Sequence, residues 1–583
     1  MKSILEQITE IVSKGFEAAG YDGTYGKVGI SNRPDLCEFQ CNGAMALAKQ
    51  YHKAPIMIAE DVAAKLSDDG AFSAIDAVAP GFLNIKVSDD FLSKYLNGME
   101  SEDKFGIPMP DPKKIIVDYG GPNVAKPLHV GHLRAAIIGE SVKRICRYLG
   151  NNVIGDVHLG DWGLQMGLII TELHERKPDL PYFDEGFTGE YPTEPPFTLA
   201  ELEEIYPCAS AKSKEDEQYK EAALTATKKL QSGDRGYRAI WRHIMDLSIP
   251  DLKRNYEDLS VEFDWWKGES SVDDLIPGMV EDMKKGGFAY ESEGALVVDV
   301  AEDSDTKEIP PCMILKSDGA ALYTTTDLAT LHDRRSKFDP DQVIYVVDKR
   351  QEMHFVQVFR CAKKTGIVKP DTKLDFLGFG TMNGKDGKPF KTREGGVMRL
   401  ETLISDIREA MYNKITENHE TDAAEARATS EIVALAAIKY GDLSNQATKD
   451  YVFDTDKFIS FEGNTGPYIL YTMVRIKSIL AKYGSDIPKH IGFAQNEHER
   501  ALMLQLTGFS QVISSAYEEI APHKICSYIY DVCNAFNRFY HETRILAEED
   551  QAKKEGWIAL LKLTLRVLET CIDLLGFSAP EKM

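Results

Sequence analysis

Two histidines, a glycine and a lysine lie close together in the stretch YGGPNVAKPLHVGHLRAA and could bind phosphate groups. His129 and His132 are three residues apart, Gly131 lies between them, and Lys126 precedes them. At the start of a helix, side chains with this spacing point the same way, and the free backbone N–H groups attract anions. These groups together suit the phosphates of a nucleotide, and Gly131 would let the nucleotide approach the backbone. The stretch contains neither a Walker loop nor the glycine fingerprint of dinucleotide-binding proteins.

Alternating strands and helices must position this turn. Strands are predicted at 113–120, 151–161, 342–348 and 373–380, and a helix with an apolar stripe is predicted at 132–150. Such alternation indicates a parallel sheet with crossover helices. Ligands of these sheets bind at the carboxyl ends of the strands, near the topological switch point. The first strand-to-helix turn, residues 119–132, is therefore the expected site.

A second cationic element is the segment GTMNGKDGKPFKTREGG, residues 380–396. It holds five glycines and four basic residues, among them Lys388 and Lys391, opposed only by Asp386 and Glu394. A loop of this kind can close over a polyphosphate. A solvated surface turn can have the same composition.

Composition changes at three places and predicts three domains. Residues 100–112 are charged and then Gly- and Pro-rich, as in a linker; residues 176–235 are acidic and Pro-containing, as in an insertion; and the pattern is helical from about Leu400 onward. The predicted fold class is α/β. It comprises a small α+β domain at 1–105, a Rossmann-type nucleotide-binding domain at 106–400 with an insertion at about 171–300, and an all-α domain at 401–583.

Overall composition limits the partners and the location. The chain has a net charge of −24, which argues against wrapping a long polyanion such as DNA. Its nine cysteines form no CxxC pair, so neither a structural zinc nor any other metal site is expected, and free thiols fit a reducing compartment. No apolar run reaches the roughly 18 residues of a membrane helix, and the first twenty residues do not read as a signal peptide. We expect a cytoplasmic protein without a membrane partner.

The phrase PNVAKPLHVGHLR resembles the His-x-Gly-His signature of class I aminoacyl-tRNA synthetases, and of the arginyl-tRNA synthetase family in particular. The resemblance continues through HLGDWGLQMG, KSDGAALYTTTDLA, DKRQEMHF, GKDGKPFKTREGG and FEGNTGPYILYTMVRI, and so spans nearly the whole chain. It implies attachment of L-arginine to tRNA(Arg) through an arginyl-adenylate, with ATP and Mg²⁺. It also implies a monomer that binds tRNA before activation and has no editing domain.

The resemblance assigns roles at the nucleotide site. The ATP-binding or catalytic candidates are Lys126, His129, Gly131, His132, Lys388, Lys391 and His354, although His354 could equally be a buried structural histidine. Two departures stand out. KPFKTR replaces the family's Lys-Met-Ser-Lys-Ser, which leaves open which lysine meets which phosphate, and Val157 stands where the family often has asparagine.

A pocket for arginine must pair a permanently charged guanidinium with at least one carboxylate, because burying that charge alone is very costly. Tyr323 and Asp327 are four residues apart at a strand-to-helix transition and would share one face of the first helical turn. By resemblance, Tyr323, Asp327 and Gln351 hold the arginine, and Asn123 lies near its ammonium and carboxylate. Glu269 is a less certain match. Asp327 alone could instead be a helix cap.

Both ends of the chain resemble tRNA-binding modules. The strand that follows Pro80 and Gly81 looks like part of the N-terminal domain that contacts the tRNA elbow, with Asn84 as the candidate. The helical C-terminal part places aromatic residues beside basic ones, which suits stacking on unpaired bases. By resemblance it is the anticodon-binding domain, and the candidates there are Tyr468, Arg475, Arg538 and Tyr540. An ordinary helical core with solvated charges would look similar.

Three alternatives stay open at this point. The first is another class I synthetase of the cysteinyl, glutamyl or lysyl type. However, no zinc site for cysteine is visible, and the pocket candidates Asp327 and Glu269 are acidic, which is wrong for glutamate. The second is a nucleotidyltransferase, most of which are short single domains. The third is a non-catalytic tRNA-binding paralogue, in which His129, Gly131 or His132 would be damaged.

Overall fold

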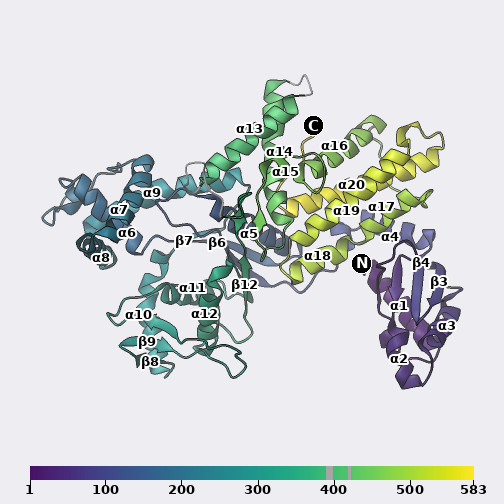
Figure 1. Cartoon of the computed structure of the whole chain (residues 1–583), viewed down its shortest axis with the longest axis horizontal. Helices are drawn as coiled ribbons and strands as arrows, with labels where there is room; N and C mark the ends of the chain where they lie inside the picture. Colours follow the sequence, from purple (N-terminus) through teal and green to yellow (C-terminus); the bar gives the residue numbers. More distant parts are fainter. Residues whose placement is uncertain (389–397, 418–421) are drawn as a thin grey trace.

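A five-stranded parallel sheet lies at the centre of the molecule (Figure 1). Its strands, in spatial order, are β12 (Lys373–Phe379), β11 (Gln342–Asp348), β5 (Lys114–Tyr119), β6 (Asn152–Leu159) and β7 (Trp265–Gly268). The four predicted strands are confirmed, and β7 adds a fifth. From β5 the chain proceeds outward through β6 to β7, then returns to the other side of β5 for β11 and β12. The topological switch point therefore lies between the carboxyl ends of β5 and β11, where a ligand is expected.

The computed structural model of the chain describes residues 1–388, 398–417 and 422–583. Lys391 of the cationic segment lies outside this part. Val157, the departure from the family pattern, is a fully buried residue of β6 and belongs to the core of the sheet.

Helix α5 (Val130–Tyr148) follows β5 and is almost entirely buried. It begins two residues before the predicted position 132, because His129 caps it. The chain leaves the helix through Gly150, whose φ of 84° is the left-handed conformation that glycine adopts without strain. One side of α5 packs on the sheet and the other on the helices at the C-terminal end of the chain. The start of this helix is thus placed by both neighbours.

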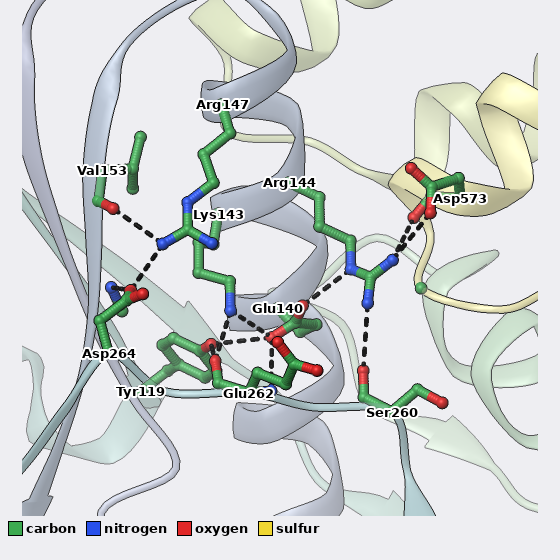
Figure 2. A network of polar contacts seen from close by, with 12 residues as sticks. Tyr119, Glu140, Lys143, Arg144, Arg147, Val153, Ser260, Glu262, Asp264 and Asp573 are labelled. Atoms are coloured by element: carbon green, nitrogen blue, oxygen red, sulfur yellow. Dashed lines mark hydrogen bonds and ion pairs between the residues drawn. The ribbon is translucent and has the colours of Figure 1, made fainter. Parts of the chain in front are cut away.

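Charged side chains tie the middle of α5 to the segment 260–264 and to α20 (Gln551–Leu574) (Figure 2). Arg144 pairs with Glu140 at 2.7 Å and with Asp573 at 3.0 Å. Glu140 also accepts a hydrogen bond from the Tyr119 hydroxyl of β5, at 2.9 Å. Nearby, the Ser141 hydroxyl donates to the carbonyl oxygen of Leu574 at 2.9 Å. These contacts join the central sheet to the C-terminal helices through α5.

The segments between the strands extend the central layer on both sides. Between β6 and β7 come four helices that project to one side in Figure 1: α6 (Leu164–Arg176), α7 (Leu199–Glu215), α8 (Glu217–Gln231) and α9 (Arg235–Asp258). Between β7 and β11 come η4 (Glu269–Leu275), α10 (Ile276–Lys285), the antiparallel strands β8 (Ala289–Ser292), β9 (Ala295–Val298) and β10 (Cys312–Leu315), and then α11 (Tyr323–Lys337). Helix α12 (Glu352–Lys364) connects β11 to β12.

The two ends of the chain form an antiparallel sheet module and a helical array that contact each other. The first contains α1 (Ile4–Ala18), β1 (Val28–Ile30), β2 (Phe39–Cys41), α2 (Gly43–Tyr51), α3 (Pro55–Leu66), β3 (Phe72–Val78), β4 (Phe82–Val87) and α4 (Asp89–Ser101). The second contains α13 (Leu400–Thr416), α14 (Ala423–Leu443), α15 (Thr455–Phe458), α16 (Gly466–Tyr483), α17 (Glu497–Thr507), α18 (Phe509–Glu518), α19 (His523–Glu542) and α20. Arg500 joins them through Glu38 and Asp89, both at 2.6 Å. A short pairing of β13 (Met382–Asn383) with β14 (Tyr451–Val452) links the helical array to the central layer.

A fully buried guanidinium fixes α11 on the sheet. Arg334 pairs with Asp118 of β5 and with Asp156 of β6, at 2.7 Å for the latter, and donates to the Tyr345 hydroxyl of β11 at 3.0 Å. Its side chain is 1% exposed, and that of Asp156 is fully buried. A single cation thus holds three adjacent strands and one helix. Because α11 carries Tyr323 and Asp327 in its first two turns, this network also places the candidate site residues.

We predict that Arg334→Met lowers the thermal stability of the chain strongly. The substitution leaves two buried carboxylates without their cation, which typically costs about 3–5 kcal/mol. Calorimetry should show the transition at a clearly lower temperature than in the wild type. The matched control Glu281→Gln removes an exposed ion pair with Lys285, whose side chains are 57% and 70% exposed, and should change little. Equal effects of the two substitutions would contradict the prediction.

Candidate active site

The two histidines cap the start of α5 reciprocally. His129 Nδ1 accepts a hydrogen bond from the backbone N–H of Gly131 at 3.0 Å, and His132 Nδ1 accepts one from the backbone N–H of His129 at 3.1 Å. The ring centres are 4.0 Å apart, which confirms the expected side-by-side placement. Because both Nδ1 atoms are acceptors, the proton of each neutral ring lies on Nε2. Each ring therefore keeps one N–H donor for a ligand.

Both rings are neutral near pH 7. Burial lowers the pKa of His132 to about 3, with smaller contributions from His129 and Lys126. Burial and the nearby Lys126 also lower the pKa of His129. Neutral imidazoles can donate hydrogen bonds to developing negative charge without having to lose or gain a proton. The pair is thus suited to phosphate stabilisation and not to proton transfer.

Gly131 and Lys126 have neighbours within the protein that the sequence did not reveal. A Cβ atom on Gly131 would lie 2.7 Å from Cε1 of the His129 ring, so glycine is needed here for the histidine itself. Lys126 Nζ lies 4.1 Å from the ring centre of Tyr206, a residue of α7. The inserted helices therefore reach the site, although nothing in the local pattern around Tyr206 indicates this.

The described residues on both sides of positions 389–397 contact elements of the central layer and the helical array. At its start, Lys385 pairs with Asp454 at 3.0 Å, while Lys388 is exposed. Just after the segment, Met398 accepts a hydrogen bond from the backbone N–H of Val130 at 3.1 Å, and the backbone N–H of Leu400 donates to Leu128 at 2.9 Å. The chain therefore returns from the cationic segment directly against the histidine turn.

Three carboxylates gather near the carboxyl ends of β6 and β7. Glu269 opens η4 after β7, Asp161 follows β6, and Asp327 lies on α11. Burial, Asp161 and Asp327 together raise the pKa of Glu269 to about 8. Tyr323 is 72% exposed at the rim of this group; partial desolvation and then the negative charge of Glu269 raise its pKa. No Lys or Arg of the described residues pairs with Glu269, so its carboxyl group has no cationic partner in the described part of the chain.

Asp161 is a site residue that the sequence analysis did not single out, although its motif HLGDWG was noted. It is 1% exposed. Its oxygens accept hydrogen bonds from the backbone N–H and the hydroxyl of Ser270, at 3.0 and 2.6 Å. It therefore stays ordered beside Glu269 and adds negative charge to the pocket.

His354 belongs to the carboxylate group. Its Nε2 lies 2.6 Å from Oδ2 of Asp327. Asp327 is not a helix cap, since the first turn of α11 is closed by Thr325, whose hydroxyl accepts from the backbone N–H of Leu322 at 3.0 Å. The structure places His354 where it can orient Asp327.

Asn123 and Gln351 lie just beyond the carboxyl ends of strands β5 and β11. Asn123 is exposed in the turn after β5 and bridges to Gly160 after β6, where the backbone N–H of Val124 donates to the Gly160 carbonyl at 3.1 Å. Gln351 is exposed at the carboxyl end of β11. They thus lie after β5 and β11, the two strands on either side of the switch point.

The candidates for contact with tRNA are only partly brought together. Arg475 Cζ lies 4.8 Å from the ring centre of Tyr471 and 5.0 Å from that of Tyr540, in a groove that His541 and Arg544 also line.

Of the other three candidates, Tyr468 is joined to the stack through Asn537, which accepts a hydrogen bond from Arg475 at 2.5 Å and donates to the Tyr468 hydroxyl at 3.0 Å, and the other two lie elsewhere. Tyr468 is half-buried and donates to Asn534 at 2.7 Å. Arg538 is exposed on α19 and does not line the groove, and Asn84 lies on β4 of the N-terminal sheet.

Known families and proteins match the chain along its length. The family models described as "tRNA synthetases class I (R), catalytic domain", "DALR anticodon binding domain" and "Arginyl tRNA synthetase N terminal domain" match residues 96–455, 469–583 and 2–87. Proteins named arginine–tRNA ligase from Agathobacter rectalis and Alkaliphilus oremlandii are 64% and 57% identical over the full length of both chains. The Plasmodium falciparum arginyl-tRNA synthetase structure superposes over both full chains with a TM-score of 0.82 at 25% identity. That from Thermus thermophilus also covers both chains and supports the fold, with a TM-score of 0.79 at 22% identity.

We predict that Glu269→Gln makes the ligand-free chain more stable, increasingly so from pH 5 to pH 8. The folded carboxyl has a pKa of about 8 against an ordinary 4.5, so the folded state holds a proton that the unfolded chain has lost in this window. The stability of the wild type therefore falls as pH rises, and glutamine removes this dependence. Calorimetry of both proteins at pH 5, 6.5 and 8 measures the difference. A stability difference between the two proteins that stays constant with pH would contradict the raised pKa of Glu269.

Proposed function

Because the chain belongs to the arginyl-tRNA synthetase family of class I enzymes, we propose how its residues divide between the steps of one reaction. The activity is the ATP-dependent attachment of arginine to tRNA. One observation supports the residue assignment. A group of carboxyl groups without a cationic partner and two neutral, N–H-donating histidines both lie at the carboxyl ends of the parallel strands.

The carboxylate pocket binds the arginine side chain. Asp327, oriented by His354, and Glu269 receive the guanidinium, and Tyr323 packs beside its stem. Asn123 and Gln351 hold the α-amino and carboxylate groups. Binding of the cation lowers the pKa of Glu269 again, so arginine binds as the proton leaves. A neutral or smaller amino acid would leave these carboxylates unpaired, which accounts for specificity without a separate editing site.

The histidine turn acts on the phosphates. The arginine carboxylate attacks the α-phosphorus of ATP in line, a new P–O bond forms, and pyrophosphate departs with the electrons of the broken bond. The Nε2–H groups of His129 and His132, with Lys126, Lys388 and Lys391, stabilise the charge on the phosphate oxygens. The hydroxyl of the terminal tRNA ribose, the 2′-OH in class I, then attacks the arginyl carbonyl and releases AMP.

Mg²⁺ is proposed to enter as part of the ATP complex. The described residues contain no group of three or more His, Cys, Asp or Glu side chains placed to hold a metal. Mg²⁺ often binds mainly to substrate phosphates with few protein ligands, so the site fits a metal delivered by the nucleotide.

The tRNA is proposed to contact both ends of the chain. The stacked residues Tyr471, Arg475 and Tyr540 receive unpaired bases, with Tyr468 and Arg538 on the same helices, and Asn84 contacts the tRNA from the N-terminal module. We assign tRNA contact to residues 1–105, catalysis to 106–400 and anticodon binding to 401–583. No described helix is both long and apolar enough to span a bilayer. A monomer that works in the cytoplasm completes this proposal.

Charging assays test the function. Purified protein with ATP, Mg²⁺ and total tRNA is given each labelled amino acid in turn, and only arginine should label tRNA.

His132→Ala removes one donor to the developing charge and should lower kcat about 10²–10³-fold with the KM for arginine little changed. Asp327→Asn should instead raise the KM for arginine. Charging with a different amino acid would refute the pocket assignment, and equal changes in both parameters for both variants would refute the division of roles.

We predict that Arg475→Ala raises the KM for tRNA about tenfold and makes binding less sensitive to salt, because one stacking and phosphate-binding side chain is lost. Filter binding at several salt concentrations measures both effects. Arg427→Ala is the control, since Arg427 also stacks on a tyrosine, 3.9 Å from the ring centre of Tyr412, but lies away from the groove. A larger rise of the KM for tRNA in Arg427→Ala than in Arg475→Ala would contradict the proposed tRNA contact at the groove.

A further inference from the structure

Arg134 is a buried guanidinium on α5 that none of the roles above uses. It lies two residues after His132, is 1% exposed, and points away from the histidine rings toward the helical array. Its Nε donates to Oδ2 of Asp442 on α14 at 3.0 Å. Its Nη1 donates to two backbone carbonyls, Gly380 at 2.7 Å and Lys449 at 3.0 Å. A charged group of this size is rarely buried without such partners.

The partners of Arg134 lie at the base of the cationic segment. Gly380 follows β12 and opens the stretch that leads to Lys385 and Lys388. The same stretch is held against residues 447–453: Gly380 donates its backbone N–H to the Ala447 carbonyl at 2.9 Å.

Bulkier residues cannot replace Gly380. A Cβ atom there would lie 2.6 Å from the Lys449 carbonyl oxygen. Arg134 bonds to both sides of this contact and thereby fixes where the cationic segment begins.

The other side of Arg134 is the histidine turn. His132 and Arg134 share the first two turns of α5, a helix whose residues are almost entirely buried. Met398 and Leu400, just after the cationic segment, are already bonded to this turn. Arg134 adds the corresponding bond at the beginning of the segment. The described residues before and after positions 389–397 are thus both hydrogen-bonded to α5 or to the turn that leads into it.

Arg134 and Asp442 pair through only one nitrogen and one oxygen. The Nη2 of Arg134 and Oδ1 of Asp442 are both buried and have no hydrogen-bond partner among the described residues. Oδ2 of Asp442 is shared with the Tyr451 hydroxyl, at 2.9 Å. A guanidinium and a carboxylate joined by a single hydrogen bond keep their second N–H donor and second oxygen available.

We propose that Arg134 is a positioning residue for adenylate formation: it sets the position of the two histidines relative to residues 380–388, the described start of the cationic segment, by bonding Gly380 and Asp442 from the helix that His129 caps. It touches neither substrate, and its effect is felt through the groups that meet ATP. The proposal rests on the phosphate roles assigned above to the histidines and lysines. Misplacement of such groups by about an ångström can cost on the order of 10²-fold in rate.

The test compares Arg134→Lys with Arg144→Lys. Both substitutions keep the positive charge on α5 and both disturb a contact with the helical array, but Arg144 pairs with Glu140 and Asp573 and reaches neither Gly380 nor the cationic segment (Figure 2). Arg134→Lys should lower kcat for arginylation about 10- to 100-fold and raise the KM for ATP, with the KM for arginine within twofold of the wild type. Arg144→Lys should lower thermal stability with kcat nearly unchanged.

Two further variants separate positioning from folding. Asp442→Asn should reproduce the kcat defect of Arg134→Lys, and the double variant should be no worse than either. Tyr451→Phe, which removes the other hydrogen bond to Asp442, should have a small effect. Equal loss of kcat in the Arg134 and Arg144 variants, or a parallel rise of all KM values, would overturn the proposal.

Hydrogen exchange gives a readout that does not depend on the reaction. The amides of residues 129–134 and 380–388 should exchange faster in Arg134→Lys than in the wild type, and at wild-type rates in Arg144→Lys. Unchanged exchange in Arg134→Lys would overturn the structural link itself. If the wild type failed to charge arginine, the proposed function would fall, while the exchange data would still decide whether Arg134 joins the two elements.

Discussion

The backbone N–H groups at the start of α5 impose the constraint on which the rest of the site depends. They need acceptors, and two imidazole Nδ1 atoms supply them. This solution fixes the orientation of both rings and leaves their Nε2–H groups for a ligand. The hydrogen bonds that cap the helix are therefore the same ones that orient both rings for the proposed phosphate site. It also explains why a glycine stands between the histidines, since any side chain there would meet a ring.

The proposed amino-acid pocket follows the opposite principle, because its carboxyl groups have no Lys or Arg partner among the described residues. Glu269 and Asp161 lie close together, partly or wholly buried, and the pKa of Glu269 rises to about 8. A folded chain gains nothing from such a group, and the cost is offset only when a cation arrives. Arg334, two turns after Asp327 on α11, shows the matched alternative, with two carboxylates and one guanidinium in a network that stabilises the fold.

Much of this arrangement follows from the sequence, and the exceptions share a physical cause. Local spacing and strand-to-helix alternation predict the strands β5, β6, β11 and β12, the helix that begins near Gly131 and the side-by-side histidines; the phosphate role of these histidines stays a prediction. Tyr206, Asp161 and Arg134 could not be found in this way. Their partners are separated from them by tens to hundreds of residues, and local periodicity carries no information about which distant side chains meet. The pairing of His354 with Asp327 is of the same kind.

The bonds between α5 and residues near 574 have a consequence for synthesis of the chain. Ser141 donates to Leu574, 433 positions later, and Arg144 pairs with Asp573. At roughly 5–20 residues per second, a ribosome needs about 20–90 s to cover that interval. Throughout this time Ser141 and Arg144 of the nascent α5 lack their partners at positions 574 and 573, and the face of α5 that packs on α20 is uncovered. The catalytic sheet therefore reaches its final packing only late in translation, and its half-assembled form is the one that chaperones and proteases meet.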